Sequence, residues 1–223
     1  MRAIALLIAL SMTMFVAGCG DDDDGPTGPG ASAEFEVIQP TVDSYTDSDI
    51  APTISAQALF DNLNDGDASN NPTIVSVRSA AHYGIGHIEG AINIPWREVG
   101  DAAQLAKLSK NDDIVIYCYT GHTGGVATTA LQALGYQATN MKFGMSAWSK
   151  DPAVRVATPF TEANDANNFP TETTVNAADS YELANPDYTA QDGEEAILMA
   201  AVENYLVDGA PVITAKAVFD NIN

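Results

Sequence analysis

The feature that most constrains this chain is a short apolar segment that ends on a cysteine and leads straight into a glycine-rich turn. Residues 114–117 (Ile-Val-Ile-Tyr) form a β-branched run typical of a buried strand in a parallel sheet. Cys118 follows, then a turn of small and polar residues at 120–125, and then residues 126–134, where apolar side chains recur at helical spacing. The pattern predicts a strand, a tight turn and a helix, with the cysteine at the end of the strand.

A turn of this kind aims several backbone N–H groups and the N-terminus of the following helix at one point. Those dipoles stabilise the thiolate of a cysteine placed there, and the same cradle of amides would hold an anionic group carried on the sulfur. The alternative is a structural cysteine, because free cysteine also packs as a small hydrophobic side chain. The glycine-rich turn directly after Cys118 favours a reactive cysteine, since a core residue needs no such turn.

The charge balance excludes some classes of partner. The 223 residues carry 30 acidic side chains against 9 basic ones, for a formal net charge of −21. Nucleic acids and anionic membrane surfaces need a basic patch to meet their phosphates, so we expect neither as a partner. The three histidines are scattered and have no metal-ligand spacing, so the sequence predicts no metal and no cofactor.

The N-terminus has the pattern of an export signal. Residues 1–18 combine a positive start with a short apolar run, and they close on Val-Ala-Gly-Cys19, which resembles the lipobox of bacterial lipoproteins. We predict a signal peptide at 1–18, lipidation of Cys19, and a flexible acidic Gly/Pro tether at 19–33. The protein would then face the periplasm or exterior of the cell envelope, touching the membrane only through its anchor. A plain secretory signal and an uncleaved anchor are the alternatives.

Lipidation of Cys19 would leave Cys118 without a disulfide partner, because the chain has only 2 cysteines. An unpaired thiol in an oxidising compartment is accounted for by a reactive role.

The remaining pattern alternates helices and strands. Residues 53–63 predict a helix with Ser55 as its N-cap, and 101–108 and 144–148 predict shorter helices. Further strands are predicted at 73–78, 91–94 and 137–143. This order predicts an α/β fold with a central parallel sheet flanked by helices, in which ligands bind at the carboxyl ends of the strands.

Three motifs in this order carry a resemblance to a known family. Residues 75–79 with 86–95, the stretch 116–124, and residues 143–148 resemble the first signature, the active-site loop and the closing motif of rhodanese-like sulfurtransferase domains. The resemblance implies a rhodanese-like fold and a persulfide on Cys118. It also implies sulfur transfer from a small donor, thiosulfate or polysulfide, to a thiophilic acceptor such as cyanide or a thiol. The cradle for the outer sulfur would be the backbone of Tyr119, Thr120, Gly121, His122, Thr123 and Gly124.

The chain departs from the family pattern at two places. The family often has an acid where Ser76 stands, two residues before Arg78, which bears on a salt bridge for that arginine. Many thiosulfate-using members carry Arg or Lys in the loop, whereas this loop has neither, and His122 is its one side chain that can become cationic. His87 resembles a position that holds a turn, and His82 is expected at the surface. A cysteine-based phosphatase needs an arginine that closes the loop, which this loop lacks.

An internal repeat lies near the C-terminus. Residues 210–223 repeat residues 51–64 with nine identities in fourteen positions. We therefore predict a rhodanese-like domain at 34–150, a linker at 151–193, and the start of an incomplete second repeat at 194–223. Chance similarity of two amphipathic helices is the alternative.

Two other functions remain open at this point. The first is a non-catalytic module that binds, senses or carries sulfur, and the absence of basic residues in the loop favours it. The second is a protein that acts only in association with a second rhodanese-like domain on another chain.

Overall fold

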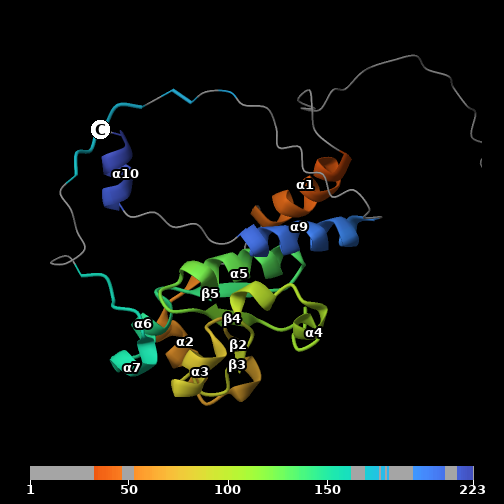
Figure 1. The fold of residues 1–223 in the computed structure, drawn as a ribbon. Helices are drawn as coiled ribbons and strands as arrows, with labels where there is room; N and C mark the ends of the chain where they lie inside the picture. The colour runs from red at the N-terminus through yellow and green to blue at the C-terminus, as the bar shows by residue number, and fades with distance from the viewer. Residues whose placement is uncertain are drawn as a thin grey trace, which may run out of the picture.

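The computed structural model describes residues 33–46, 53–161, 169–175, 177–178, 180, 193–208 and 215–222. A parallel sheet of five strands in the order β1-β5-β4-β2-β3 forms its centre (Figure 1). The strands are β1 Thr53–Ile54, β2 Thr73–Ser76, β3 Ile92–Asn93, β4 Ile114–Tyr117 and β5 Ala138–Met141. Every paired strand runs parallel to its neighbour. The predicted α/β fold with a central parallel sheet flanked by helices is confirmed.

Helices cover both faces of the sheet (Figure 1). The described helices are α1 Ala33–Thr46, α2 Ala56–Leu63, α3 Ala80–Ile85, α4 Ala102–Leu105, α5 His122–Ala133, α6 Gly144–Trp148, α7 Pro152–Arg155, α9 Glu194–Asp208 and α10 Ala215–Ile222, with two 3-10 turns, η1 Ala68–Asn70 and η2 Trp96–Glu98. Of these, α10 is drawn apart from the sheet (Figure 1). Among these described helices, none combines the length and the apolar character needed to span a bilayer.

Alternate residues of the strands feed two separate cores, because successive side chains of a strand point to opposite faces. On one face, Val75, Val77, Ile114 and Ile116 pack with Cys118, with Ala127 and Leu131 of α5, and with Val202 and Leu206 of α9. On the other face, Ile74, Val115 and Tyr117 pack with Leu59 of α2 and Met145 of α6. The cysteine therefore belongs to the face that α5 and α9 cover.

The helix α9 joins this core although it lies far along the chain. It runs beside α1, and both lie against α5 (Figure 1). Arg97 stacks on the Trp96 ring and donates hydrogen bonds to the carbonyls of Leu206 and Val207 at 2.8 and 2.9 Å. These bonds satisfy carbonyl groups near the C-terminal end of α9, where the helix itself offers no donors.

Helices α2 and α10 hold equivalent positions in the internal repeat, but their surroundings differ. Leu59 of α2 is 0% exposed, while its counterpart Val218 of α10 is 41% exposed. Phe219 stacks on Phe169 with ring centres 4.6 Å apart. The second repeat, like the domain boundaries at 34–150, 151–193 and 194–223, stays a prediction.

The structure confirms some predicted elements and corrects others. Ser55 caps α2 by accepting a hydrogen bond from the Ala58 amide at 3.0 Å. Residues 53 and 54 form a strand and not the first turn of that helix, because they pair with β5. The helix after the cysteine begins at His122, not at residue 126. The predicted signal peptide at 1–18 and the lipidated Cys19 lie outside the described residues, as does the predicted tether at 19–33 except for Ala33, which begins α1.

Candidate functional site

Cys118 stands at the carboxyl end of the central strand β4, at the point where the chain turns into α5. Its Sγ accepts a hydrogen bond from the backbone N–H of Gly121 at 3.1 Å, and the residue is 1% exposed. The loop from 118 to 121 thus folds back over its own sulfur. An amide aimed at sulfur stabilises negative charge placed there, because the N–H dipole points its positive end at the charge.

The turn can close this tightly because Gly121 adopts a left-handed conformation with φ 95°. Glycine reaches that region without steric cost. The Gly121 carbonyl accepts from the Gly125 N–H at 3.0 Å and from the Asn140 side-chain amide at 3.0 Å. The amides of Thr123 and Gly124 precede this first helical hydrogen bond, so they have no acceptor within the helix. Of the predicted cradle, residues 119–121 therefore lie in the loop, and residues 122–124 form the first turn of α5.

The turn that leads into α6 closes the cradle from the other side. The Met145 N–H donates to the Cys118 carbonyl at 2.8 Å, and the Ser146 N–H donates to the Tyr119 carbonyl at 3.0 Å. A Cβ atom on Gly144 would lie 2.5 Å from the Cys118 carbonyl oxygen, closer than such atoms approach. Glycine is thus required where the two segments touch, and the three predicted motifs meet at one place.

A family model described as the rhodanese-like domain matches residues 55–151. Residues 55–151 are a rhodanese-like domain. The match spans all three motifs quoted from the sequence, so the predicted family is confirmed.

Two similar curated proteins are named as sulfurtransferases. Thiosulfate sulfurtransferase PspE of Escherichia coli is 39% identical over 62 residues, which is 28% of this chain and 60% of that protein. Thiosulfate:glutathione sulfurtransferase of Saccharomyces cerevisiae is 33% identical over 90 residues, 35% of this chain and 65% of that protein. The chain therefore spans less than two thirds of the length of each of these two relatives.

Solved structures of rhodanese-like proteins also match. The rhodanese-like domain protein of Staphylococcus aureus is 29% identical with a TM-score of 0.40, over 44% of this chain and 90% of that one. A human single-domain sulfurtransferase is 32% identical with a TM-score of 0.39, over 44% of this chain and 95% of that one.

Within the rhodanese-like domain, Tyr119 is held by a polar contact that the sequence did not predict. Its hydroxyl accepts from the Ser79 N–H at 3.2 Å and lies 2.7 Å from Nδ1 of His82, whose ring meets it edge-on. His82 is therefore half-buried against the cradle, and its predicted place at the open surface is wrong. No sequence periodicity connects positions 37 residues apart; the contact arises because α3 follows β2, the neighbour of β4.

Arg78 of the rhodanese-like domain is fully buried and bonds to carbonyls in place of an acid. Its guanidinium donates to the carbonyls of Val154 at 2.9 Å and Gly86 at 2.5 Å, and its Nε donates to the Ser76 hydroxyl at 3.3 Å. It also lies 5.5 Å from the centre of the Tyr117 ring. No carboxylate among the described residues lies within ion-pair distance of it, so carbonyl dipoles and an aromatic face balance this charge.

The other residues named from the sequence are placed as follows. His87 stacks on Tyr83 with ring centres 3.9 Å apart, and its Nδ1 lies 3.0 Å from the Tyr83 carbonyl. His122 opens α5 and is exposed, as is Thr120 in the loop. Among the described residues, no group of three His, Cys, Asp or Glu side chains is arranged to hold a metal ion.

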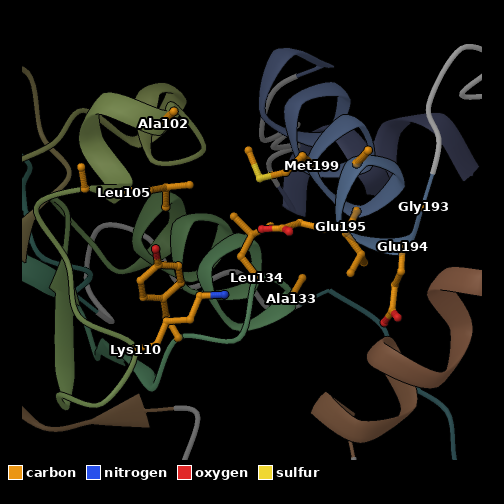
Figure 2. Close-up of a pocket in the computed structure, with 13 residues that line it drawn as sticks. Ala102, Leu105, Lys110, Ala133, Leu134, Gly193, Glu194, Glu195 and Met199 are labelled. Carbon is orange, nitrogen blue, oxygen red and sulfur yellow. The ribbon is translucent and has the colours of Figure 1, made fainter.

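A groove lined by described residues lies away from the cysteine. It has a volume of about 1080 Å³ and lies between α4, the C-terminal end of α5 and the start of α9 (Figure 2). Lys110, Leu134, Glu195 and Met199 line it, together with Tyr136, whose pKa is raised by burial. Lys110 and Tyr136 precede β4 and β5, so this groove is at the amino ends of the strands, opposite Cys118.

Proposed function

We propose that this rhodanese-like domain is a sulfurtransferase that carries sulfane sulfur as a persulfide on Cys118. The observation that carries the proposal is the Gly121 N–H aimed at Sγ from 3.1 Å, in a loop that runs directly into the N-terminus of α5. Amides in this arrangement stabilise negative charge on the sulfur and on an atom attached to it. The sulfurtransferase relatives support the same reaction class.

The first half-reaction loads the cysteine. The Cys118 thiolate attacks the outer sulfur of thiosulfate, the S–S bond of the donor breaks, and sulfite leaves with the electron pair of that bond. The enzyme is left as the persulfide anion Cys118–S–S⁻. The charge of −3 on thiolate plus thiosulfate is found again on persulfide plus sulfite, so no oxidant or reductant is needed. The outer sulfur would lie among the backbone amides of Tyr119, Thr120, Gly121, His122, Thr123 and Gly124.

The second half-reaction transfers the outer sulfur from Cys118 to the acceptor. The acceptor, cyanide or a thiolate, attacks the outer sulfur of the protonated persulfide, and Cys118 leaves as the thiolate. The products are thiocyanate and a proton from cyanide, or an acceptor persulfide from a thiol. The amides that stabilised the persulfide stabilise the departing thiolate as well, so one cradle serves both steps.

A second candidate is a domain that binds or carries sulfur without turning it over. Two observations favour it: Cys118 is 1% exposed, and the loop from 118 to 125 has neither Lys nor Arg to attract an anionic donor. For catalysis, the residues that bury Cys118 would have to move to admit the donor.

The test is the intact mass of the purified full chain after incubation with thiosulfate and then with cyanide. The proposal expects a gain of the mass of one sulfur atom, absent in Cys118→Ser, and its removal by cyanide with release of thiocyanate. Polysulfide is the second donor to be tried. An adduct that forms but is not discharged by cyanide or by thiols favours the carrier, and a thiol left unmodified by both donors refutes the enzyme.

We also propose that the mature chain is anchored in the cell envelope by lipid on Cys19. The support is the sequence around that cysteine, and Cys19→Ala is the matched variant. Membrane fractionation together with labelling by a radioactive fatty acid would detect the anchor, and an unlabelled wild-type chain in the soluble fraction would exclude it. An association with a second rhodanese-like domain would be detected by a gain in turnover when such a domain is added.

A further inference from the structure

An exposed aromatic residue stands directly beside the cradle. Phe143 lies between β5 and α6, and its side chain is 68% exposed. A Cβ atom on Gly121 would lie 3.1 Å from the Phe143 nitrogen and 3.6 Å from its Cα. Gly121 is the residue whose amide bonds the Cys118 sulfur, so Phe143 is in the layer of residues next to the reacting atoms.

The backbone of Phe143 is in a conformation that a bulky residue rarely adopts. Its φ of 60° and ψ of 7° belong to the left-handed region, which glycine enters freely and a phenylalanine enters only under constraint. The constraint is visible on both sides. The Lys142 N–H donates to the Ile54 carbonyl at 2.9 Å, and the Ser146 hydroxyl donates to the Phe143 carbonyl at 2.6 Å. Strain held in place by surrounding bonds is concentrated at functional sites.

The fold gives no reason for a large apolar side chain here. Phe143 belongs to neither of the two cores, and none of the ring–ring contacts among the described residues includes it. An aromatic ring in water at a strained position adds nothing to stability, since its apolar surface is still hydrated. What it does supply is an exposed apolar side chain on a residue whose backbone touches the cradle.

The charges of the loop indicate what that face would meet. Between 118 and 125 the loop has no Lys or Arg, and its ionisable residues besides the cysteine are Tyr119 and His122. Tyr119 already has its hydroxyl engaged by Ser79 and His82. The loop itself therefore offers no Lys or Arg for an ion pair, and the exposed Lys142 lies outside it, next to Phe143. A substrate with an apolar skeleton finds an exposed ring.

We propose that Phe143 determines acceptor specificity by contacting the organic part of a thiol, and that the acceptor is a thiol with an aromatic or otherwise apolar skeleton. The inference rests on the proposed sulfurtransferase function. The acceptor thiolate R–S⁻ attacks the outer sulfur of Cys118–S–SH, and the products are R–S–SH and the Cys118 thiolate. The new S–S bond replaces the one that breaks, and the proton stays on the transferred sulfur. Phe143 touches R and not the sulfur, so it acts on acceptor binding alone.

The experiment compares an aromatic thiol, 4-methylbenzenethiol, with cyanide as acceptors for the full-length wild type, Phe143→Gly, Phe143→Ala and Phe143→Tyr. Removing the ring is expected to raise KM for the aromatic thiol about tenfold, which corresponds to about 1.4 kcal/mol. The kcat for that thiol, the KM for cyanide and the rate of sulfur uptake from the donor should stay within about twofold. Tyrosine keeps the ring and should keep the wild-type KM.

Two comparisons separate the ring from the backbone. Glycine relieves the left-handed strain and alanine retains it, so an equal rise of KM in both assigns the effect to the ring. Phe160, 71% exposed in the segment after α7, gives the matched control Phe160→Ala, which should change none of these constants.

An unchanged KM for the aromatic thiol in both ring-less variants overturns the inference, and so does a rise of KM for cyanide by the same factor. A wild-type chain that takes up no sulfur refutes the proposed function and this inference with it. A chain that takes up sulfur without distinguishing the variants refutes the inference alone.

Discussion

Replacing Gly144 by alanine should separate the two segments that form the cradle. The added Cβ would lie 2.5 Å from the carbonyl oxygen of Cys118, 2.8 Å from its carbonyl carbon and 2.9 Å from the carbonyl carbon of Tyr119. All three are backbone atoms of the loop, so no side chain can swing aside. The φ of 50° at this position adds a conformational cost for any residue with a Cβ.

The size of the effect follows from these two contributions. Overpacking of a close contact costs roughly 1–3 kcal/mol, and the left-handed conformation costs a non-glycine residue roughly 1–2 kcal/mol. Together they lower the free energy of unfolding by about 2–5 kcal/mol, a large part of the roughly 5–15 kcal/mol typical of a domain. Relief by movement of α6 would instead break the bonds from Met145 and Ser146 to the loop carbonyls. Sulfur uptake should then fall even where the chain is still folded.

Urea unfolding followed by tryptophan fluorescence measures this, since Trp148 is the last residue of α6. Gly84→Ala is the matched control: it lies in α3, nothing is within 4 Å of its added Cβ, and it should stabilise by up to about 1 kcal/mol. If Gly144→Ala has the wild-type midpoint and takes up sulfur at the wild-type rate, the two segments are not in the close contact described and the reasoning fails.

Three further outcomes are expected. Arg78→Met should lower the free energy of unfolding by about 1–3 kcal/mol for each of the carbonyls of Gly86 and Val154 that it leaves buried without a donor; a urea midpoint unchanged from wild type would contradict this. Arg97→Ala should reduce amide-exchange protection at the C-terminal end of α9 while β4 keeps its protection, and equal loss in both would show that the two unfold as one. Hydrogen bonds from Asn70 to Asp65 and from Ser69 to Asp67 hold the pKa values of these two carboxyl groups below the ordinary value for aspartate. The small contribution of the two carboxylates to stability is therefore present at pH values above the ordinary pKa, and it is lost as the pH falls through the lowered pKa values. Carboxyl chemical shifts followed by NMR measure both, and midpoints at the ordinary value would exclude these hydrogen bonds in solution.

The parts of the site that the sequence predicted are those with a local signature. A β-branched run that ends on a cysteine before glycines specifies strand, turn and reactive position together, because each follows from neighbouring residues. The helix start was placed four residues late, at 126 and not at His122, since two adjacent glycines at 124 and 125 are typical of a turn. In the structure, Gly124 lies in the first turn of α5, and glycine is needed there because a Cβ would clash with the Asn140 side chain, a contact that is not local.

The residues that the sequence did not identify depend on tertiary contacts. The residues around Phe143 do not predict its left-handed conformation. Hydrogen bonds hold that conformation, from the Lys142 N–H to β1 and from the Ser146 hydroxyl of α6 to the Phe143 carbonyl. His82 belongs to a short helix without clear periodicity, and its contact with Tyr119 needs the sheet order to be known. The strand β1 has only two residues and exists only by pairing with β5, so no pattern of its own predicts it.

The packing of α9 on the face of the sheet that holds Cys118 has a consequence for where this protein can be cut. Val202 and Leu206 share one buried cluster with Cys118, although the recognisable family region ends at residue 151. Excising residues 55–151 would therefore uncover the apolar surface of α5 and η2 that α9 now shields from water. We expect such an excised domain to be less stable than the longer chain, so engineering of the domain should retain α9.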